Sequence, residues 1–202
     1  WDDQPTSAEA AIESLMRAVM ISETAPYGPT YVCQDAGLQE TKVGETPAMP
    51  RPDRFRAPEA SPPAAQLVAQ AAARLASAER PLILAGRVKR GEAEWEARIR
   101  LAEALDARVL TDLKVAAAFP TNHRLHGAPA GYFNTEAGLD LVRKADVILS
   151  LDWVDLGGTL KAAFGGANPE ATVIQVSVDQ HNHKGWNMDY QVLPPVDLYL
   201  LT

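Results

Sequence analysis

The sequence predicts an α/β domain of three layers, with a mainly parallel sheet of about six strands. Short apolar runs alternate with amphipathic segments of helical period, which is the pattern of successive β-α-β units. Two of the runs, residues 81–85 and 146–151, are apolar on both faces, as the strands of a buried parallel sheet are. The first run ends at Gly86, and the loops that follow such strands are where doubly wound folds hold ligands.

Composition narrows the class of protein further. Apolar residues make up 47% of the 202 residues, which supplies a sizeable core and argues against a disordered chain. The formal net charge of −7, without a basic stripe, argues against nucleic acid as a partner. No apolar run approaches the roughly 18 residues of a membrane span. The lone Cys33 excludes an intramolecular disulfide and suits the reducing cytoplasm, where we expect the protein to act. The chain lacks an initiator methionine, and we expect it to be part of a longer protein.

The first third of the chain predicts one helix, one strand and a linker. Thr6 and Glu9 have the spacing of a capping box, and apolar residues recur on one helical face through residues 8–20. A proline-bearing break follows, and residues 30–33 predict a short buried strand. Residues 37–60 are polar and rich in proline without any period, which is typical of an extended linker between domains.

Residues 61–202 carry the predicted domain. Ser61 before Pro62 predicts the N-cap of a helix whose apolar face runs to Leu75. The expected strands are residues 81–85, 108–111, 146–151, 172–178 and 198–201, and the expected helices between them are residues 95–105, 136–144 and 159–164. Because strands and helices alternate throughout, we expect a Rossmann-like arrangement with helices on both faces of the sheet.

The loop after the first of these strands suggests an anion site. Gly86 and Gly91 have the glycine spacing of a phosphate loop, but residues 92–93 are Glu-Ala where a P-loop has Lys and Ser or Thr, so that motif is excluded. Arg87, Lys89 and Arg90 remain near a helix N-terminus, whose N–H groups and dipole favour a pyrophosphate. The alternative is that all three are solvated surface charges.

Further polar residues follow strands at the same edge of the predicted sheet. A carboxylate directly after a strand takes the hydroxyls of a ribose or, equally, caps the next helix or turn. The candidate nucleotide site therefore comprises Gly86, Arg87, Lys89, Thr111, Asp152 and Asp179. His181 and His183 lack a third ligand at a familiar metal spacing, so no metal site is predicted. No catalytic constellation is evident from spacing.

The run from Arg80 to Asp179 resembles the central domain of thiamine diphosphate-dependent enzymes of the acetolactate synthase and benzoylformate decarboxylase group. The order and spacing of several pieces carry the likeness, namely residues 80–86, 101–113, 118–123, 145–151 and 173–179. The helix at 8–20 and residues 28–32 are similar to the end of the family's pyrimidine-binding domain. The resemblance thus implies three parts: residues 1–36 as the C-terminal remnant of a pyrimidine-binding domain, 37–60 as a linker, and 61–202 as the central domain.

The resemblance also implies a function. Enzymes of this group are lyases, decarboxylases or carboligases (transferases) acting on 2-oxo acids or related carbonyl compounds. In the family, the glutamate that activates thiamine diphosphate lies upstream of the segment found here, and a Gly-Asp-Gly…Asn motif downstream holds Mg²⁺ and the diphosphate. We therefore expect no catalytic or metal-binding residue in this chain and no activity from it alone. Its expected partners are the missing N- and C-terminal domains of the same chain, within a homodimer or homotetramer.

Some relatives hold FAD or ADP in the central domain, and others leave that place empty. The flavin-binding relatives carry three glycines after the first strand, where this chain has Ala85, Gly86 and Arg87. They also carry an arginine-bearing segment after a later strand, where this chain has residues 150–156 instead. These departures favour a structural central domain over a nucleotide-bound one. Two alternatives stay open: a free-standing module that binds FAD, ADP or NAD, and a structural interaction domain.

Overall fold

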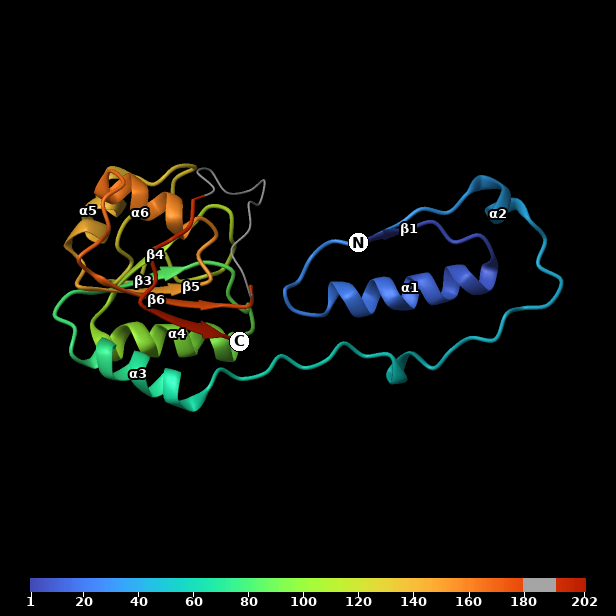
Figure 1. Cartoon of the computed structure of the whole chain (residues 1–202), viewed down its shortest axis with the longest axis horizontal. Helices are drawn as coiled ribbons and strands as arrows, with labels where there is room; N and C mark the ends of the chain where they lie inside the picture. Colours follow the sequence, from blue (N-terminus) through green and yellow to red (C-terminus); the bar gives the residue numbers. More distant parts are fainter. Residues whose placement is uncertain (180–191) are drawn as a thin grey trace. The chain divides into compact units, whose positions relative to one another are not determined.

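The computed structural model describes residues 1–179 and 192–202. The chain divides into two compact units, Trp1–Ser61 and Pro62–Thr202, and each is considered by itself (Figure 1). The two histidines that the sequence analysis weighed as metal ligands, His181 and His183, lie outside the described residues.

The first unit contains a small β-α-β arrangement. Helix α1 (Ala8–Ser22) lies in the chain between strands β1 (Asp2–Asp3) and β2 (Tyr31–Val32), which pair in parallel. The sequence predicted a buried strand at residues 30–33. That prediction was wrong about burial, because Tyr31 is 66% exposed and the strand has a partner on one side.

Local capping sets the helices of the first unit. Ser7, and not the predicted Thr6, is the N-cap of α1, and its hydroxyl accepts the amide hydrogen of Ala10. The predicted linker contains two short helical turns, α2 (Ala36–Glu40) and η1 (Pro52–Arg54). Both are too short to have shown a hydrophobic period in the sequence.

Among the described residues, five parallel strands form the sheet of the second unit, in the order β4-β3-β5-β6-β7. The strands are β3 (Pro81–Ala85), β4 (Arg108–Thr111), β5 (Val147–Leu151), β6 (Thr172–Ser177) and β7 (Leu198–Leu201). Each lies within one residue of its predicted bounds, and the parallel α/β class is confirmed. The strand order changes direction between β3 and β5, so the topological switch point lies between these two strands.

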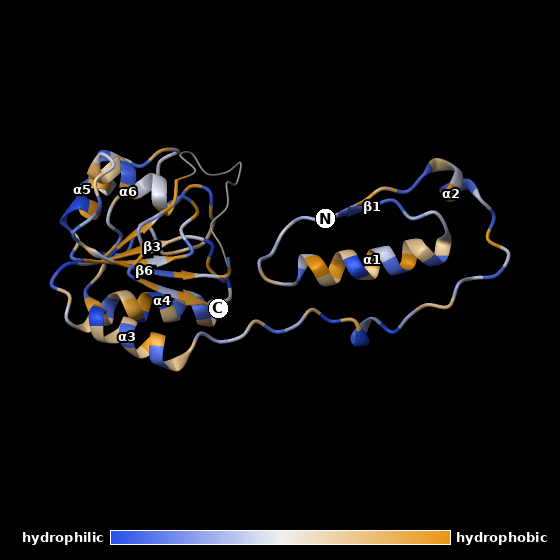
Figure 2. Ribbon diagram, in the orientation of Figure 1, coloured by the Kyte–Doolittle hydropathy of each residue, from blue (hydrophilic) through white to orange (hydrophobic). Residues whose placement is uncertain are grey.

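Helices cover both faces of this sheet and make it a three-layer domain (Figure 1). Helices α3 (Ala65–Ala76) and α4 (Glu92–Leu105) pack on one face, and α5 (Glu136–Lys144) and α6 (Leu156–Phe164) pack on the other. The apolar strands form the centre of the unit in Figure 2, and the helices around them carry both polar and apolar residues. Alternate residues of β3 enter the two cores: Ile83 contacts the α3/α4 side, while Leu82 and Leu84 contact the other.

Three helices begin at residues other than those predicted. Helix α3 begins after Ala64 and not after Ser61, since Pro62 precedes a second proline and a residue before proline disfavours the helical conformation. Helix α4 begins at Glu92, three residues earlier than expected. Helix α6 begins at Leu156, because the carboxylate of Asp155 accepts the amide hydrogen of Gly158 at 3.0 Å and caps it.

Candidate functional site

At the switch point the backbones after β3 and β5 are in direct contact. The Gly86 amide donates to the carbonyl of Leu151 at 3.0 Å, and the Arg87 amide donates to the carbonyl of Asp152 at 3.0 Å. The Val88 amide donates to the carbonyl of Gly86 at 2.8 Å. A Cβ placed on Gly86 would lie 2.2 Å from the carbonyl oxygen of Asp152. Three successive N–H groups, the kind that would face a pyrophosphate, are therefore already bonded within the protein.

Arg87 joins the ends of three strands through its side chain. Its Nε lies 2.8 Å from Oδ2 of Asp152 and its Nη2 3.1 Å from Oδ1, a bidentate pair. The same Nη2 lies 2.5 Å from Oδ2 of Asp179. The carboxylates are 11% and 13% exposed, against 38% for the arginine side chain. Burial lowers the pKa of Arg87, but the charges of Asp152 and Asp179 and their hydrogen bonds more than offset this, so that its pKa lies above the usual value.

Two residues that the sequence analysis did not single out complete this group. The Ser177 hydroxyl donates to Oδ1 of Asp152 at 2.5 Å and accepts the Asp179 amide hydrogen at 3.0 Å. The Tyr199 hydroxyl donates to the carbonyl of Asp179 at 2.7 Å. We name Arg87, Asp152, Ser177, Asp179 and Tyr199 the strand-end cluster. Ser177 stands two residues before Asp179 at the end of a strand. Side chains two residues apart on a strand point to the same face, so this spacing was the signal in the sequence that could have placed Ser177 beside Asp179.

Of the six predicted site residues, Lys89 and Thr111 lie apart from both Gly86 and the strand-end cluster. Lys89 pairs with Glu94 at 2.6 Å, and its side chain is 79% exposed. Thr111 lies at the end of β4, where its hydroxyl is 3.1 Å from Nε2 of His126. Burial lowers the pKa of His126, and the positive charge of Arg108 lowers it further, below the usual 6.5. The structure thus brings Gly86, Arg87, Asp152 and Asp179 together, and separates Lys89 and Thr111 from them.

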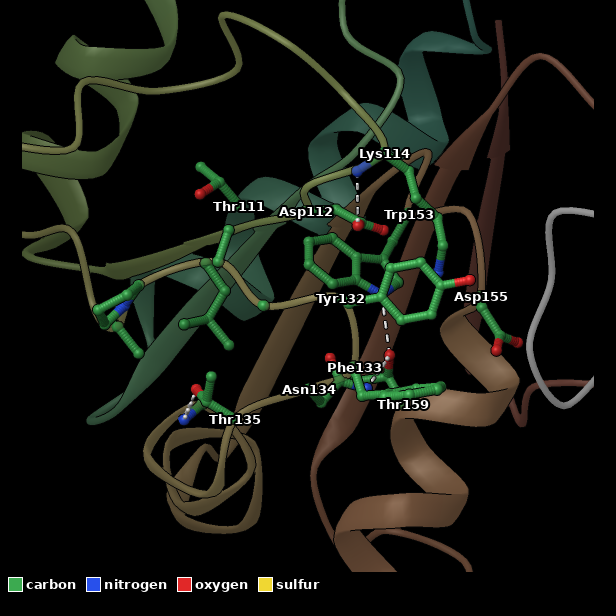
Figure 3. A pocket seen from close by; sticks show the side chains of 16 residues that line it. Thr111, Asp112, Lys114, Tyr132, Phe133, Asn134, Thr135, Trp153, Asp155 and Thr159 are labelled. Atoms are coloured by element: carbon green, nitrogen blue, oxygen red, sulfur yellow. Dashed lines mark hydrogen bonds between the residues drawn. The ribbon is translucent and has the colours of Figure 1, made fainter.

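Thr111 instead lines a cleft bounded by the ends of β4 and β5 and the first turns of α5 and α6 (Figure 3). The rings of Tyr132 and Phe133 stand at its mouth, 70% and 64% exposed, with their centroids 4.9 Å apart and edge to face. Trp153 is buried at its floor. Exposed aromatic faces beside a sheet edge are suited to stacking on a planar ring.

Thr159 organises the polar floor of this cleft. Its hydroxyl oxygen accepts the indole N–H of Trp153 at 2.9 Å and the side-chain amide of Asn134 at 3.1 Å (Figure 3). The hydroxyl hydrogen is left as a donor, because an oxygen that accepts two bonds still carries its own proton. Tyr132, Phe133 and Asn134 could not be identified from the sequence, because the long loop before α5 that carries them shows neither helical nor strand period.

The described residues do not fit a magnesium diphosphate group. Within residues 1–179 and 192–202, no three His, Cys, Asp or Glu side chains come together in a way that could hold a metal ion. Asp152 and Asp179 are the carboxylates that gather at the switch point, and both are paired with Arg87.

Within residues 1–179 and 192–202, no helix is long and apolar enough to cross a bilayer.

The fold is that of a doubly wound α/β domain. At its switch point, the residues of the strand-end cluster are bonded to one another. The family model described as "Thiamine pyrophosphate enzyme, central domain" matches residues 68–200, and the chain belongs to this family. The predicted likeness to thiamine diphosphate-dependent enzymes is thereby confirmed.

The chain spans only a small part of the length of the curated relatives described next. The probable sulfoacetaldehyde acetyltransferase of Rhizobium meliloti (strain 1021) is 43% identical over 104 residues, which cover 51% of this chain and 17% of the relative. The sulfoacetaldehyde acetyltransferase of Alcaligenes xylosoxydans xylosoxydans is 37% identical over 141 residues, or 68% of this chain and 22% of the relative. The acetolactate synthase of Mycobacterium bovis (strain ATCC BAA-935 / AF2122/97) is 30% identical over 132 residues, or 63% and 21%. The matched part is about a fifth of each relative.

Solved structures show the same fold at low identity. Benzoylformate decarboxylase from Polynucleobacter necessarius superposes with a TM-score of 0.65 at 20% identity, covering 99% of this chain and 35% of that one. A structure from Mycobacterium smegmatis superposes with the same TM-score at 19% identity, covering 98% and 36%.

Proposed function

We propose that the chain forms the central, non-catalytic part of a thiamine diphosphate-dependent lyase, decarboxylase or carboligase acting on 2-oxo acids or related carbonyl compounds. The family assignment supports this, as do relatives named sulfoacetaldehyde acetyltransferase and acetolactate synthase. The observation that carries the non-catalytic role is the strand-end cluster. The groups at the switch point that would otherwise hold a ligand are bonded to one another. Their role is therefore to hold the carboxyl ends of the strands together.

The same proposal assigns roles to the parts of the chain. Residues 1–36 are the end of a pyrimidine-binding domain, 37–60 a linker and 61–202 the central domain. Thiamine diphosphate and Mg²⁺ are held by other parts of a longer protein, because the described residues do not offer ligands for them. The relatives' greater length supports this assignment. We further propose a cytoplasmic homo-oligomer, whose state size-exclusion chromatography with light scattering would measure.

A second function is favoured by a different observation. The cleft beside Thr111 presents the exposed rings of Tyr132 and Phe133 next to the carboxyl ends of β4 and β5. A nucleotide-binding module for FAD, ADP or NAD would use such rings to stack on the base or the flavin. An interaction domain without a small-molecule ligand would use them against a protein surface.

Calorimetric titration of the purified chain separates the scaffold function from the nucleotide-binding module. With FAD, ADP, NAD, and thiamine diphosphate with Mg²⁺, we expect no saturable heat from any of the four. Saturable binding of FAD, ADP or NAD would replace the scaffold role by a nucleotide module. Repeating the titration with Tyr132→Ala would then tell whether the nucleotide lies in the cleft.

The enzymatic part of the proposal is tested on the protein that the complete reading frame encodes. We expect a glutamate-bearing segment upstream and a Gly-Asp-Gly…Asn segment downstream. With added thiamine diphosphate and Mg²⁺, that protein should consume a 2-oxo acid or a related carbonyl compound. A reading frame without both segments would refute this part of the proposal.

A further inference from the structure

We propose that Arg87 is a positioning residue whose guanidinium takes the place of a ligand at the switch point and holds the ends of β3, β5 and β6 together. The inference rests on the proposed function, since it requires a switch point that takes no nucleotide. It goes beyond that function because it names the side chain that closes the switch point. It also names the kind of group that the site there accepts, which is a guanidinium.

The contacts of Arg87 are those of a bound planar cation. One edge of the guanidinium pairs with both oxygens of Asp152, and the Nη2 group also reaches Asp179. These partners lie 65 and 92 residues further along the chain, so the pairing exists only in the folded sheet. Such fork-shaped pairing is specific to guanidinium and is poorly reproduced by an ammonium group.

The carboxylates are built to receive this cation. Asp152 has a left-handed backbone, with φ of 54°, which costs energy for a residue other than glycine. Its side chain is largely buried, and Ser177 donates to it from β6. Asp179 is held from the other side, since Tyr199 of β7 donates to its carbonyl. Hydrogen bonds other than those of Arg87 therefore hold the carboxylate of Asp152 and the backbone of Asp179 in place.

The burial of its two carboxylates separates this group from an ordinary surface ion pair. In the pair of Arg124 with Asp106 the side chains are 63% and 78% exposed, and such pairs contribute little to stability. Removing Arg87 would leave Asp152 and Asp179 close together, largely out of water and without their shared cation. Uncompensated buried charge is strongly destabilising. The same removal would expose an anionic site with the shape of a guanidinium.

The test compares Arg87→Ala with Arg90→Ala in the full 202-residue chain. Arg90 lies in the same loop and is exposed, so it controls for the loss of a basic residue there. We expect Arg87→Ala to lower the melting temperature by on the order of 5–10 °C and Arg90→Ala to leave it unchanged. Adding about 10 mM guanidinium chloride should raise the melting temperature of Arg87→Ala alone, and urea, a neutral molecule of the same shape, should not.

Two further variants keep the test decisive if Arg87→Ala fails to fold. Arg87→Lys should fold and melt below the wild type, because it keeps the charge and loses the fork. Asp179→Asn combined with Arg87→Ala should fold where Arg87→Ala does not, since one unpaired carboxylate is gone.

Each outcome bears on one proposal. Arg87→Ala melting with Arg90→Ala, or equal effects of guanidinium and urea, would overturn the role of Arg87 and leave the scaffold function intact. Nucleotide binding by the wild-type chain would refute the scaffold function by a separate measurement.

Discussion

Replacing Gly86 by alanine tests how closely the ends of β3 and β5 approach. The added Cβ would lie 2.2 Å from the carbonyl oxygen of Asp152 and 2.5 Å from Cα of Trp153. Both are backbone atoms, so no side chain can turn away, and the strand ends must separate. Separation weakens the amide bonds of Gly86 to Leu151 and of Arg87 to Asp152, each worth about 1 kcal/mol. Overpacking adds about 1–3 kcal/mol, so we expect the free energy of unfolding to fall by about 3–5 kcal/mol.

Urea denaturation followed by far-UV circular dichroism measures this loss. Gly138→Ala in α5 is the matched control, because the nearest atom to its new Cβ is the Thr135 hydroxyl oxygen at 3.3 Å. Alanine favours the helix over glycine by about 1 kcal/mol, so this variant should stay within about 1 kcal/mol of the wild type.

A loss below about 1 kcal/mol for Gly86→Ala, with the slope against urea unchanged, would refute the reasoning. It would mean that the loops after β3 and β5 leave space between them. That space is what a phosphate would need, so the result would also weaken the scaffold role.

Two other variants probe electrostatics on the second unit. The Asp146 carboxylate accepts the amides of Glu79 and Arg80 at 2.7 and 2.9 Å; burial raises its pKa, but these bonds lower it more, to below 3.8. Because the pKa is lowered in the folded state, the ionised carboxylate stabilises the fold above about pH 4, and this stabilisation is lost as the pH falls further. Asp146→Asn should therefore lower the free energy of unfolding by about 1 kcal/mol at pH 7 and by less at pH 3, as measured by urea denaturation. An equal loss at both pH values would contradict this. Arg108→Gln should raise the pKa of His126 toward 6.5, because the arginine charge is one of the two causes that lower it. An NMR titration of the ring showing no upward shift would exclude that cause.

The strands could be predicted from the sequence because burial on both faces leaves a continuous apolar run. All five residues of β3 are buried, and a run of that kind is visible without knowledge of its neighbours. Strand β1 could not be predicted in this way. Asp2 and Asp3 are exposed and polar, and they form a strand only because β2 lies alongside. Helix α2 left a local signal, since the carboxylate of Asp35 accepts the amides of Gly37 and Leu38.

The candidate site was predictable in position and not in chemistry. The rule that ligands lie beyond the carboxyl ends of parallel strands selected Gly86, Arg87, Asp152 and Asp179, and these do meet. Whether an arginine and two carboxylates meet a ligand or one another depends on side-chain directions and on strand order, which local pattern does not contain. Lys89 was selected as a basic residue near a helix N-terminus, yet it pairs with Glu94 in the loop after β3.

The two features at the strand ends differ in what they leave free for a ligand. In the strand-end cluster the amides after β3 are donors to backbone carbonyls, and Arg87 is shared by two carboxylates. A phosphate entering there would have to displace bonds that already exist and would meet Asp152 and Asp179 as like charges. In the cleft the rings of Tyr132 and Phe133 remain exposed. Of these two features, the cleft is therefore where we expect a planar ligand to bind, and the affinity of such a ligand should fall in Tyr132→Ala and stay unchanged in Arg90→Ala.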